Sequence, residues 1–312
     1  MDAGPGMLYM PAMMKRMKRT TAALALGLVF LLWSPACMAG DGPLFFWEIQ
    51  GHGNTMYLLG SVHFAEESLY PLDSRITDAF DRADALVVEV DVMQADQLEV
   101  ISFMGKKGQY PPGETLTENL SQKTLDKLKE LKISLLLFNN LRPWYFALIL
   151  QVREYKSIGL DESLGIDVHF LRQAHEKGMD ILQLETVLEQ MAAFASVPEE
   201  YEDDFLYQSL LELDKTEEFL ANLFSMWNQG DVAGMAEFLR ERVAEDPRFT
   251  DFFEAIIFSR NDRMAAKLAD MLQSGKQCFA VVGALHMVGE RGIIEQLRGM
   301  GFNVRQIGAD QG

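Results

Sequence analysis

The chain has 312 residues, with 46 acidic against 28 basic side chains and a formal net charge of −18 at pH 7. Such an excess of negative charge repels the phosphates of nucleic acids and anionic membrane surfaces, so we expect neither as a partner. Hydrophobic residues make up 48% of the chain, which is enough for one large core or two smaller ones.

The segment 1–39 is typical of a secretory signal peptide. Four basic residues between positions 15 and 19 precede the apolar run 22–33, and the small residues Cys37 and Ala39 follow. The apolar run is too short to span a bilayer comfortably. Cleavage after Ala39 removes all four of these basic side chains but only Asp2 among the acidic ones, so the mature chain is still more negative. We therefore expect an exported, soluble protein in the periplasm or outside the cell.

The two cysteines bear on anchoring and on disulfides. Residues 34–37 resemble a lipoprotein cleavage box, but no leucine or similar residue lies three positions before Cys37. Lipid attachment at Cys37 is therefore not expected, and an uncleaved membrane anchor is the other alternative. After cleavage only Cys278 remains, so no disulfide forms within the chain, and its apolar surroundings indicate a packed thiol.

The N-terminal part of the mature chain predicts a strand, a helix and a second strand. Residues 44–50 and 56–59 flank a glycine-rich turn and predict a hairpin. Asp73 or Ser74 is a suitable cap for an amphipathic helix, and residues 85–90 form an apolar run typical of a buried strand. These elements predict a right-handed parallel unit, with the strand at 85–90 beside the strand at 56–59.

The C-terminal part repeats this plan with strands near 278–282 and 302–307 around a short helix. The region between the two units is mostly helical by periodicity, with one strand at 180–184. We therefore predict an α/β fold with a central, mainly parallel sheet built from N- and C-terminal βαβ units. The expected segments are a signal peptide at 1–39, the first half of the core at 40–112, a helical insertion at 113–272 and the second half of the core at 273–312.

Both predicted units contain a strand that ends in the pattern Gly-x-x-His. The first pattern has Gly60 and His63, and the second has Gly283 and His286. A glycine lets the backbone turn tightly as a strand ends, and open α/β sheets bind their ligands outside the carboxyl ends of the strands. The repeated pattern therefore predicts that the two histidines meet at one site.

Glu89 lies near the end of the predicted strand at 85–90, within an apolar sequence. A buried carboxylate is costly unless it is paired. Two histidines and one carboxylate are a ligand set that leaves open positions on a catalytic metal. We therefore predict that His63, Glu89 and His286 form a catalytic metal site.

Each of these residues has a structural alternative. A histidine after an apolar strand is more often a hydrogen-bonded core residue than a ligand, but the repetition of the pattern favours function. His52 lies in the predicted turn and is expected to be solvated, whereas His169 and His175 are six residues apart on a predicted helix and do not share a face. The chain contains no nucleophile elbow, phosphate loop or dinucleotide fingerprint, which weakens serine-hydrolase, nucleotide-binding and hydride-transfer functions.

Two more spots could support the site. Arg260 and Asn261 begin a predicted helix just before the second Gly-x-x-His strand. A guanidinium and an amide there could bind a substrate carboxylate or hold the metal ligands, or could simply be solvated. Glu185 follows the strand at 180–184, where we expect it to cap the next helix rather than to join the site.

Further short motifs lie in order along nearly the whole mature chain. They are the segment 58–63, Glu89, Pro143 with Trp144, Gly159 with Asp161, the segment 184–186, Trp227 with Gly230 and Asp231, Arg260 with Asn261, and the segment 282–286 with Gly289. Each motif alone is weak. Together the ordered set resembles the TraB, PrgY and GumN family, whose animal relatives are the Tiki proteins.

The resemblance implies a fold akin to that of the erythromycin esterase and ChaN group. It also implies a metal-dependent peptidase in which the two Gly-x-x-His motifs and a glutamate, here Glu89, form the active site. Manganese or cobalt is suggested by the resemblance to Tiki proteins. Imidazole and carboxylate ligands alone equally allow zinc or iron.

The leading hypothesis is therefore an exported hydrolase that uses a divalent metal ion to activate water, with a peptide or protein as its substrate. In this hypothesis Arg260 and Asn261 orient the substrate or support the metal ligands. A non-catalytic haem- or metal-binding protein is an alternative, because ChaN-like relatives bind haem or iron. A protein that sequesters an exported peptide is another. The sequence leaves the substrate, the metal and the oligomeric state open.

Overall fold

The sheet begins with the hairpin that the sequence predicts. The computed structural model describes residues 42–308, and the predicted signal peptide lies outside them. Strands β1 (Phe46–Gly51) and β2 (Asn54–Ser61) pair antiparallel. The turn between them passes through His52 and Gly53, both with positive φ, a conformation that glycine adopts without steric cost. His52 is exposed in this turn, as predicted.

Within the described residues, six strands form one mixed sheet in the order β4-β3-β5-β2-β1-β6. Strands β4, β3, β5 and β2 run parallel, and β1 runs antiparallel to β2 and β6. The predicted mixed α/β class with a mainly parallel sheet is therefore confirmed. The remaining strands are β3 (Ala85–Val88), β4 (Asp180–Gln183), β5 (Cys278–Gly283) and β6 (Asn303–Gln306).

The predicted neighbour relation between β2 and β3 is wrong, because β5 lies between them. Ala280 of β5 pairs with Leu58 on one side and with Val87 on the other. The strand–helix–strand unit thus skips one position, and a strand from the C-terminal part of the chain fills it. Hydrophobic periodicity identifies a buried strand but carries no information about its neighbours. The consequence is that His286 reaches the site from the centre of the sheet.

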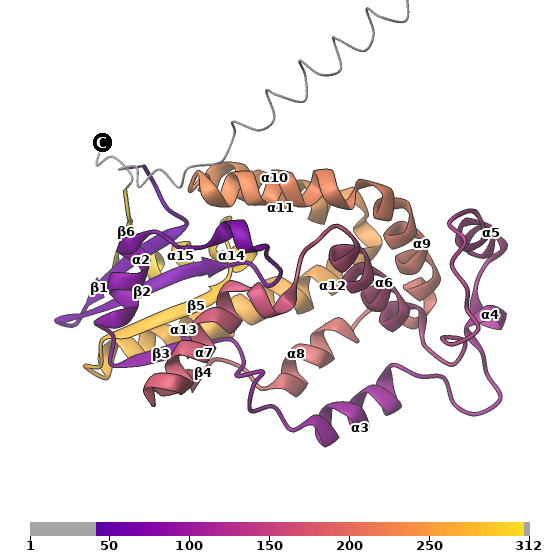
Figure 1. The fold of residues 1–312 in the computed structure, drawn as a ribbon, viewed down its shortest axis with the longest axis horizontal. Coiled ribbons are helices and arrows are strands. Elements are labelled where there is room, and N and C mark those ends of the chain that lie inside the picture. The colour runs from indigo at the N-terminus through magenta and orange to yellow at the C-terminus, as the bar shows by residue number, and fades with distance from the viewer. Residues whose placement is uncertain (1–41, 309–312) are drawn as a thin grey trace, which may run out of the picture. The chain divides into compact units, whose positions relative to one another are not determined.

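Helices cover both faces of the sheet around β5, whose six residues are all buried. Phe80 of α2 (Ser74–Asp81) and Phe170 of α7 (Ile166–Lys177) pack on Phe279 of β5, with ring centroids 4.9 to 5.5 Å apart. Figure 1 shows α2 and α7 in front of the strands and α13 (Ser259–Gln273) behind them. Since parallel strands are buried on two faces, this layering explains why β3 and β5 read as continuous apolar runs.

The predicted cap of the first helix is Asp73, whose side chain accepts the backbone N–H of Arg75 at 2.8 Å. In α2 the residues Ile76, Ala79 and Phe80 are buried, the spacing of an amphipathic helix. The helices are α2 (Ser74–Asp81), α3 (Gln97–Lys107), α4 (Leu116–Asn119), α5 (Gln122–Glu130), α6 (Pro143–Ser157), α7 (Ile166–Lys177), α8 (Val187–Phe194), α9 (Glu202–Glu212), α10 (Thr216–Asn228), α11 (Val232–Glu245), α12 (Thr250–Phe253), α13 (Ser259–Gln273), α14 (Ala284–Met287) and α15 (Ile293–Gly299).

The region between β3 and β5 is mostly helical, and it supplies the edge strand β4. Helices α5, α6 and α9 build a hydrophobic cluster of their own, with Leu128, Phe146 and Leu206 buried in it. The boundaries expected at 112/113 and 272/273 stay predictions. Among residues 42–308, no helix combines the length and the hydropathy needed to cross a bilayer.

Candidate functional site

The predicted site residues come together beside Gly283, at the end of β5. A Cβ atom added to Gly283 would lie 3.2 Å from Glu89 Oε1, 3.4 Å from His286 Cδ2 and 3.5 Å from His63 Nε2. These three side chains follow β3, β5 and β2, which are adjacent parallel strands whose carboxyl ends meet at one edge. A glycine at position 283 therefore leaves the space in which the three groups meet.

His63 is held by a carboxylate on α7. Its Nδ1 lies 3.0 Å from Asp167 Oδ1, and its side chain is 56% exposed. The negative charge of Asp167 raises the pKa of His63 to about 9, since an anion stabilises the imidazolium. Gly165, just before α7, makes this approach possible because a Cβ there would lie 2.4 Å from the carbonyl oxygen of His63.

His286 is held by an amide in the interior. Its Nδ1 lies 2.6 Å from Asn261 Oδ1, and Asn261 Nδ2 donates to the carbonyl of Arg291 at 2.9 Å. That second bond fixes the amide so that its oxygen faces His286, which must then donate through Nδ1–H. Burial lowers the pKa of His286 to about 4, so the ring is neutral at pH 7 and its Nε2 carries a lone pair.

Glu89 is an ionised, almost fully buried carboxylate. The backbone N–H of Gly283 donates to Oε1 at 2.7 Å, and Gln190 Nε2 and the Arg260 guanidinium donate to Oε2. Burial raises the pKa of Glu89, but the charges of His286, Arg260 and His63 outweigh this effect and lower it to about 2. Glu89 thus meets the condition for a buried charge, which is pairing.

Arg260 links Glu89 to a second buried carboxylate, Glu185. Arg260 Nε donates to Glu185 Oε2 at 2.8 Å, and Arg263 donates to Glu185 Oε1 at 3.2 Å. The expected capping role of Glu185 is wrong, since Thr186 caps α8 through a reciprocal pair of hydrogen bonds with Glu189. A strand-end position suits a cap and a buried ion pair equally, so the sequence did not separate the two.

Arg260 and Asn261 lie behind the site rather than at its mouth. Arg260 is 4% exposed and Asn261 is fully buried. They contact Glu89 and His286 directly. Arg260 and Asn261 lie in the first turn of α13. Because Met264, Leu268 and Leu272 of this helix are buried in the core, that first turn is held against the ends of the strands.

The first Gly-x-x-His turn is fixed by Trp227 of α10. The indole Nε1–H donates to the carbonyl of Gly60 at 2.6 Å in a buried hydrogen bond. A Cβ at Gly60 would lie 2.5 Å from the ring of Phe45. Close packing against an aromatic ring therefore requires a glycine at position 60, whereas a Cβ at position 283 would enter the space among the three site residues.

The donor chemistry of the two histidines fits a divalent metal ion. In each, Nδ1 faces an oxygen acceptor and Nε2 faces away from it, an arrangement that is usual for metal-binding histidines. Nε2 of His286 already carries a lone pair, whereas Nε2 of His63 would have to lose its proton before it could bind an ion. Glu89 fits less directly, because both of its oxygens accept hydrogen bonds. Among residues 42–308, no three His, Cys, Asp or Glu side chains stand close enough together to hold an ion.

Ser61, next to the site, has a hydroxyl with an unused bonding capacity. Within the described part of the chain its Oγ is buried and has no hydrogen-bond partner. Ser61 pairs with Gly283 across β2 and β5, and paired residues of parallel strands point to the same face of a sheet. The Ser61 hydroxyl therefore lies on the same face of the sheet as the space beside Gly283, where His63 and Glu89 meet.

Sequence reasoning missed two residues that touch the site, Asp167 and Gln190. Both lie on helices of the region between the strands, and no local motif distinguishes them from other polar residues. One further carboxylate–histidine pair lies near the site. Asp91, two residues after Glu89 in the chain, is buried, and its Oδ2 lies 2.9 Å from His175 Nε2. His175 thus has a carboxylate partner outside the predicted site.

Comparison with known proteins places the site in a family. The chain is similar to the uncharacterized protein YbaP of Escherichia coli strain K12, with 27% identity over 246 residues that cover 78% of this chain and 87% of that protein. YbaP of Shigella flexneri matches to the same extent. An uncharacterized protein of Treponema pallidum is 27% identical over 146 residues, 44% of each chain.

No solved structure gives a significant match. The TraB/PrgY/gumN family model matches residues 45–306, from the first strand to the last. The match includes His63, Glu89 and His286 and the helices that hold them, and the chain belongs to the TraB/PrgY/gumN family.

Proposed function

We propose that this protein is a divalent-metal-dependent hydrolase that acts on peptides outside the cytoplasm. The observation that carries the proposal is the matched support of two histidines. Asp167 and Asn261 occupy the Nδ1 sides of His63 and His286, and both rings approach Gly283. Polar partners placed in this way on the Nδ1 side of two converging imidazoles are characteristic of a ligand site rather than of packing.

The ion would lie between His63 and His286, with Glu89 as third ligand or as acceptor for a bound water molecule. A divalent ion there supplies a Lewis acid and lowers the pKa of bound water to about 7. Direct ligation by Glu89 requires the exchange of one of its present hydrogen bonds. Arg260 keeps Glu89 ionised and Asn261 keeps Nε2 of His286 unprotonated, so both residues act through their neighbours.

The proposed site is open on one side only. His63 is more than half exposed, whereas Glu89 and His286 are 7% and 5% exposed. A substrate would therefore approach from the side of His63, while the buried residues hold the geometry. Manganese and cobalt are proposed first because the resemblance to Tiki proteins suggests them, and zinc and iron second because they accept the same imidazole and carboxylate ligands.

The experiment that tests the function compares metal content and peptide cleavage. The purified protein is treated with chelator, reloaded with manganese, cobalt, zinc or iron(II), and incubated with a mixed peptide library that is analysed by mass spectrometry. We expect cleavage that needs metal and that disappears in His63→Ala and His286→Ala. His52→Asn is the matched control, because His52 is exposed in a turn with positive φ that asparagine tolerates.

Two outcomes would contradict the proposal. Metal-dependent cleavage that survives both histidine substitutions would place the chemistry elsewhere. Haem absorbance without any cleavage would favour a non-catalytic binding protein. Export is tested separately by cell fractionation and by sequencing the N-terminus of the exported protein, which we expect to begin at Gly40.

A further inference from the structure

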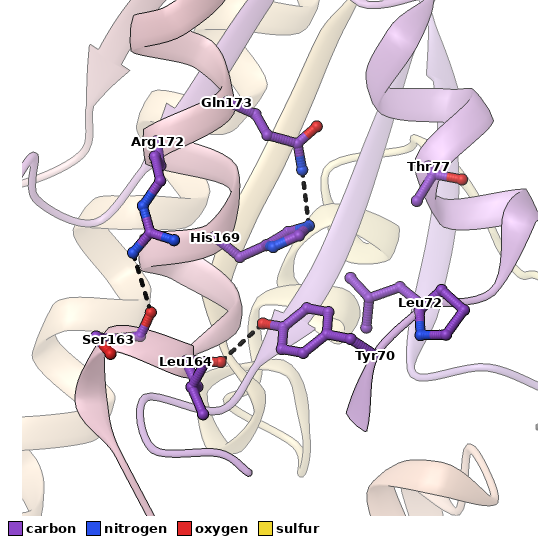
Figure 2. Close-up of a pocket in the computed structure, with 9 residues that line it drawn as sticks. Tyr70, Leu72, Thr77, Ser163, Leu164, His169, Arg172 and Gln173 are labelled. Carbon is purple, nitrogen blue, oxygen red and sulfur yellow. Dashed lines mark hydrogen bonds between the residues drawn. The ribbon is translucent and has the colours of Figure 1, made fainter. Parts of the chain in front are cut away.

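A hollow that takes no part in the site around Gly283 lies beside α7. It has a volume of about 530 Å³ and is lined by the segment 70–77 on one side and by α7 with the turn before it on the other. Figure 2 shows His169 and Gln173 extending from the helix on the side of Tyr70 and Leu72, and Arg172 extending toward Ser163. This pocket therefore needs an explanation of its own.

The pocket contains one cationic group, Arg172. Its guanidinium donates to the carbonyl of Ser163 at 3.2 Å and, within residues 42–308, has no carboxylate in ion-pair contact. Arg172 is exposed and open to solvent, whereas the partly or fully buried arginines Arg142, Arg242 and Arg260 pair with carboxylates. A guanidinium with free N–H groups is a ready partner for a carboxylate ligand.

The rest of the lining is apolar or neutral. The rings of Tyr70 and His169 are in contact, with centroids 4.6 Å apart and planes tilted by 32°, and Leu72 is buried close to them. Burial and the nearby Arg172 lower the pKa of His169, so this imidazole is neutral and accepts from Gln173 Nε2 at 2.7 Å. An apolar platform beside a single positive charge suits a molecule that has a flat or apolar body and one carboxylate.

Hydrogen bonds connect the pocket wall to the first site. Tyr70 OH donates to the carbonyl of Leu164 at 2.7 Å, and the N–H of Ile166 donates to the carbonyl of Val62 at 3.0 Å. The next residue in this turn is Asp167, which holds His63. A ligand in the pocket therefore rests on the helix that positions His63.

We infer that this pocket binds a carboxylate attached to an apolar or aromatic body, with Arg172 as the anchor and the tilted, contacting rings of Tyr70 and His169 as its apolar wall. The C-terminal residue of a peptide and a free aromatic acid share this chemistry. If the ligand is a peptide, its chain runs from the pocket toward His63. This last link alone rests on the proposed function.

The inference is tested by calorimetric titration of the full-length protein with three probes. These are the peptide acetyl-Ala-Ala-Phe with a free carboxylate, the same peptide as its C-terminal amide, and 3-phenylpropionate. We expect the free-acid peptide or phenylpropionate to bind, and the amide to bind at least about tenfold more weakly, since a charge-assisted hydrogen bond is lost. Binding of the peptide alone assigns the pocket to peptide ends, and equal binding of phenylpropionate assigns it to small acids.

Variants locate the binding. Arg172→Gln should weaken binding by about tenfold or more, whereas Arg153→Gln, an exposed arginine on α6, should leave it unchanged. The inference is overturned if the peptide amide binds as tightly as the free-acid peptide, or if Arg172→Gln binds the acids as tightly as the native protein does. It is also overturned if neither acid binds at millimolar concentration. Binding is read without cleavage, so a failure of the hydrolase proposal leaves this result intact, and the reverse also holds.

Discussion

The side-chain oxygen of Asn261 lies 2.6 Å from Nδ1 of His286, and both residues are buried. Because the other end of the amide donates to the carbonyl of Arg291, the imidazole has a single orientation and a single neutral tautomer. A buried ring prepared in this way binds a metal ion without reorganisation.

Asn261→Ala should therefore weaken metal binding without removing a ligand. Loss of the bond to Nδ1 frees the ring to rotate, and loss of such a supporting partner lowers metal affinity by about 10- to 100-fold. Metal titration under competition with a chromophoric chelator measures the change. Asn228→Ala, an exposed position on α10, is the control. Equal affinity in Asn261→Ala and the native protein would remove Asn261 from the site.

Gly283→Ala should abolish the function and keep the fold. The new methyl group would lie in the space between Glu89, His286 and His63, at 3.2 to 3.5 Å from each. The backbone at Gly283 has φ −50°, which alanine adopts readily, so we expect the free energy of unfolding to change by no more than about 1 kcal/mol. Metal binding and cleavage should fall together.

Gly105→Ala is the matched control for this substitution, because a Cβ at Gly105 meets no atom within 4 Å. Circular dichroism and thermal unfolding confirm folding of both variants. Native metal affinity in folded Gly283→Ala would show that the ion does not lie among the three side chains.

Ser61→Ala should stabilise the protein. The buried hydroxyl has no partner among the described residues, and an unsatisfied buried polar group costs about 1 to 3 kcal/mol. Chemical denaturation should therefore show a gain of about 1 kcal/mol. A clear loss of stability in Ser61→Ala would mean that the hydroxyl has a bonding partner.

Glu202 should make stability depend on pH. Burial raises the pKa of Glu202 to about 7, although Arg142 Nε donates to it at 2.9 Å. A folded-state pKa above the ordinary value of 4.5 means that the stability contributed by the group is fully present below about pH 4.5 and is lost as the pH rises through 7. The native protein should lose up to about 3 kcal/mol relative to Glu202→Gln between about pH 4.5 and 8. Parallel pH profiles of the two proteins would contradict this assignment.

Sequence patterns within single segments predicted the helices and strands, but they did not predict the order of the strands in the sheet. The apolar patterns of residues 44–50, 56–59, 85–90 and 278–282 predicted strands, and Asp73 or Ser74 predicted a helix start. The insertion of β5 between β2 and β3 depends on packing between segments that the whole helical region separates in the chain. No pattern within either segment records that choice.

The site was predictable where its residues follow strands and not where they lie on helices. His63, Glu89 and His286 each follow a strand, so a rule about sheet edges was enough to bring them together. Asp167 and Gln190 reach the same point from α7 and α8, at positions fixed by the tilt of each helix on the sheet. Side chains that complete a site from a packed helix are specified by tertiary structure alone.

The order of the strands also constrains how the chain matures. β5 occupies the middle of the sheet, yet β1, β2, β3, β4 and the helices up to α13 all precede it in the chain. During synthesis β2 and β3 therefore wait for their common neighbour, and His63 and Glu89 remain apart until the segment 278–283 has been made. A sheet whose central strand arrives so late leaves the earlier segments without their native partners for most of synthesis, so the sheet can close only after nearly the whole chain has been made.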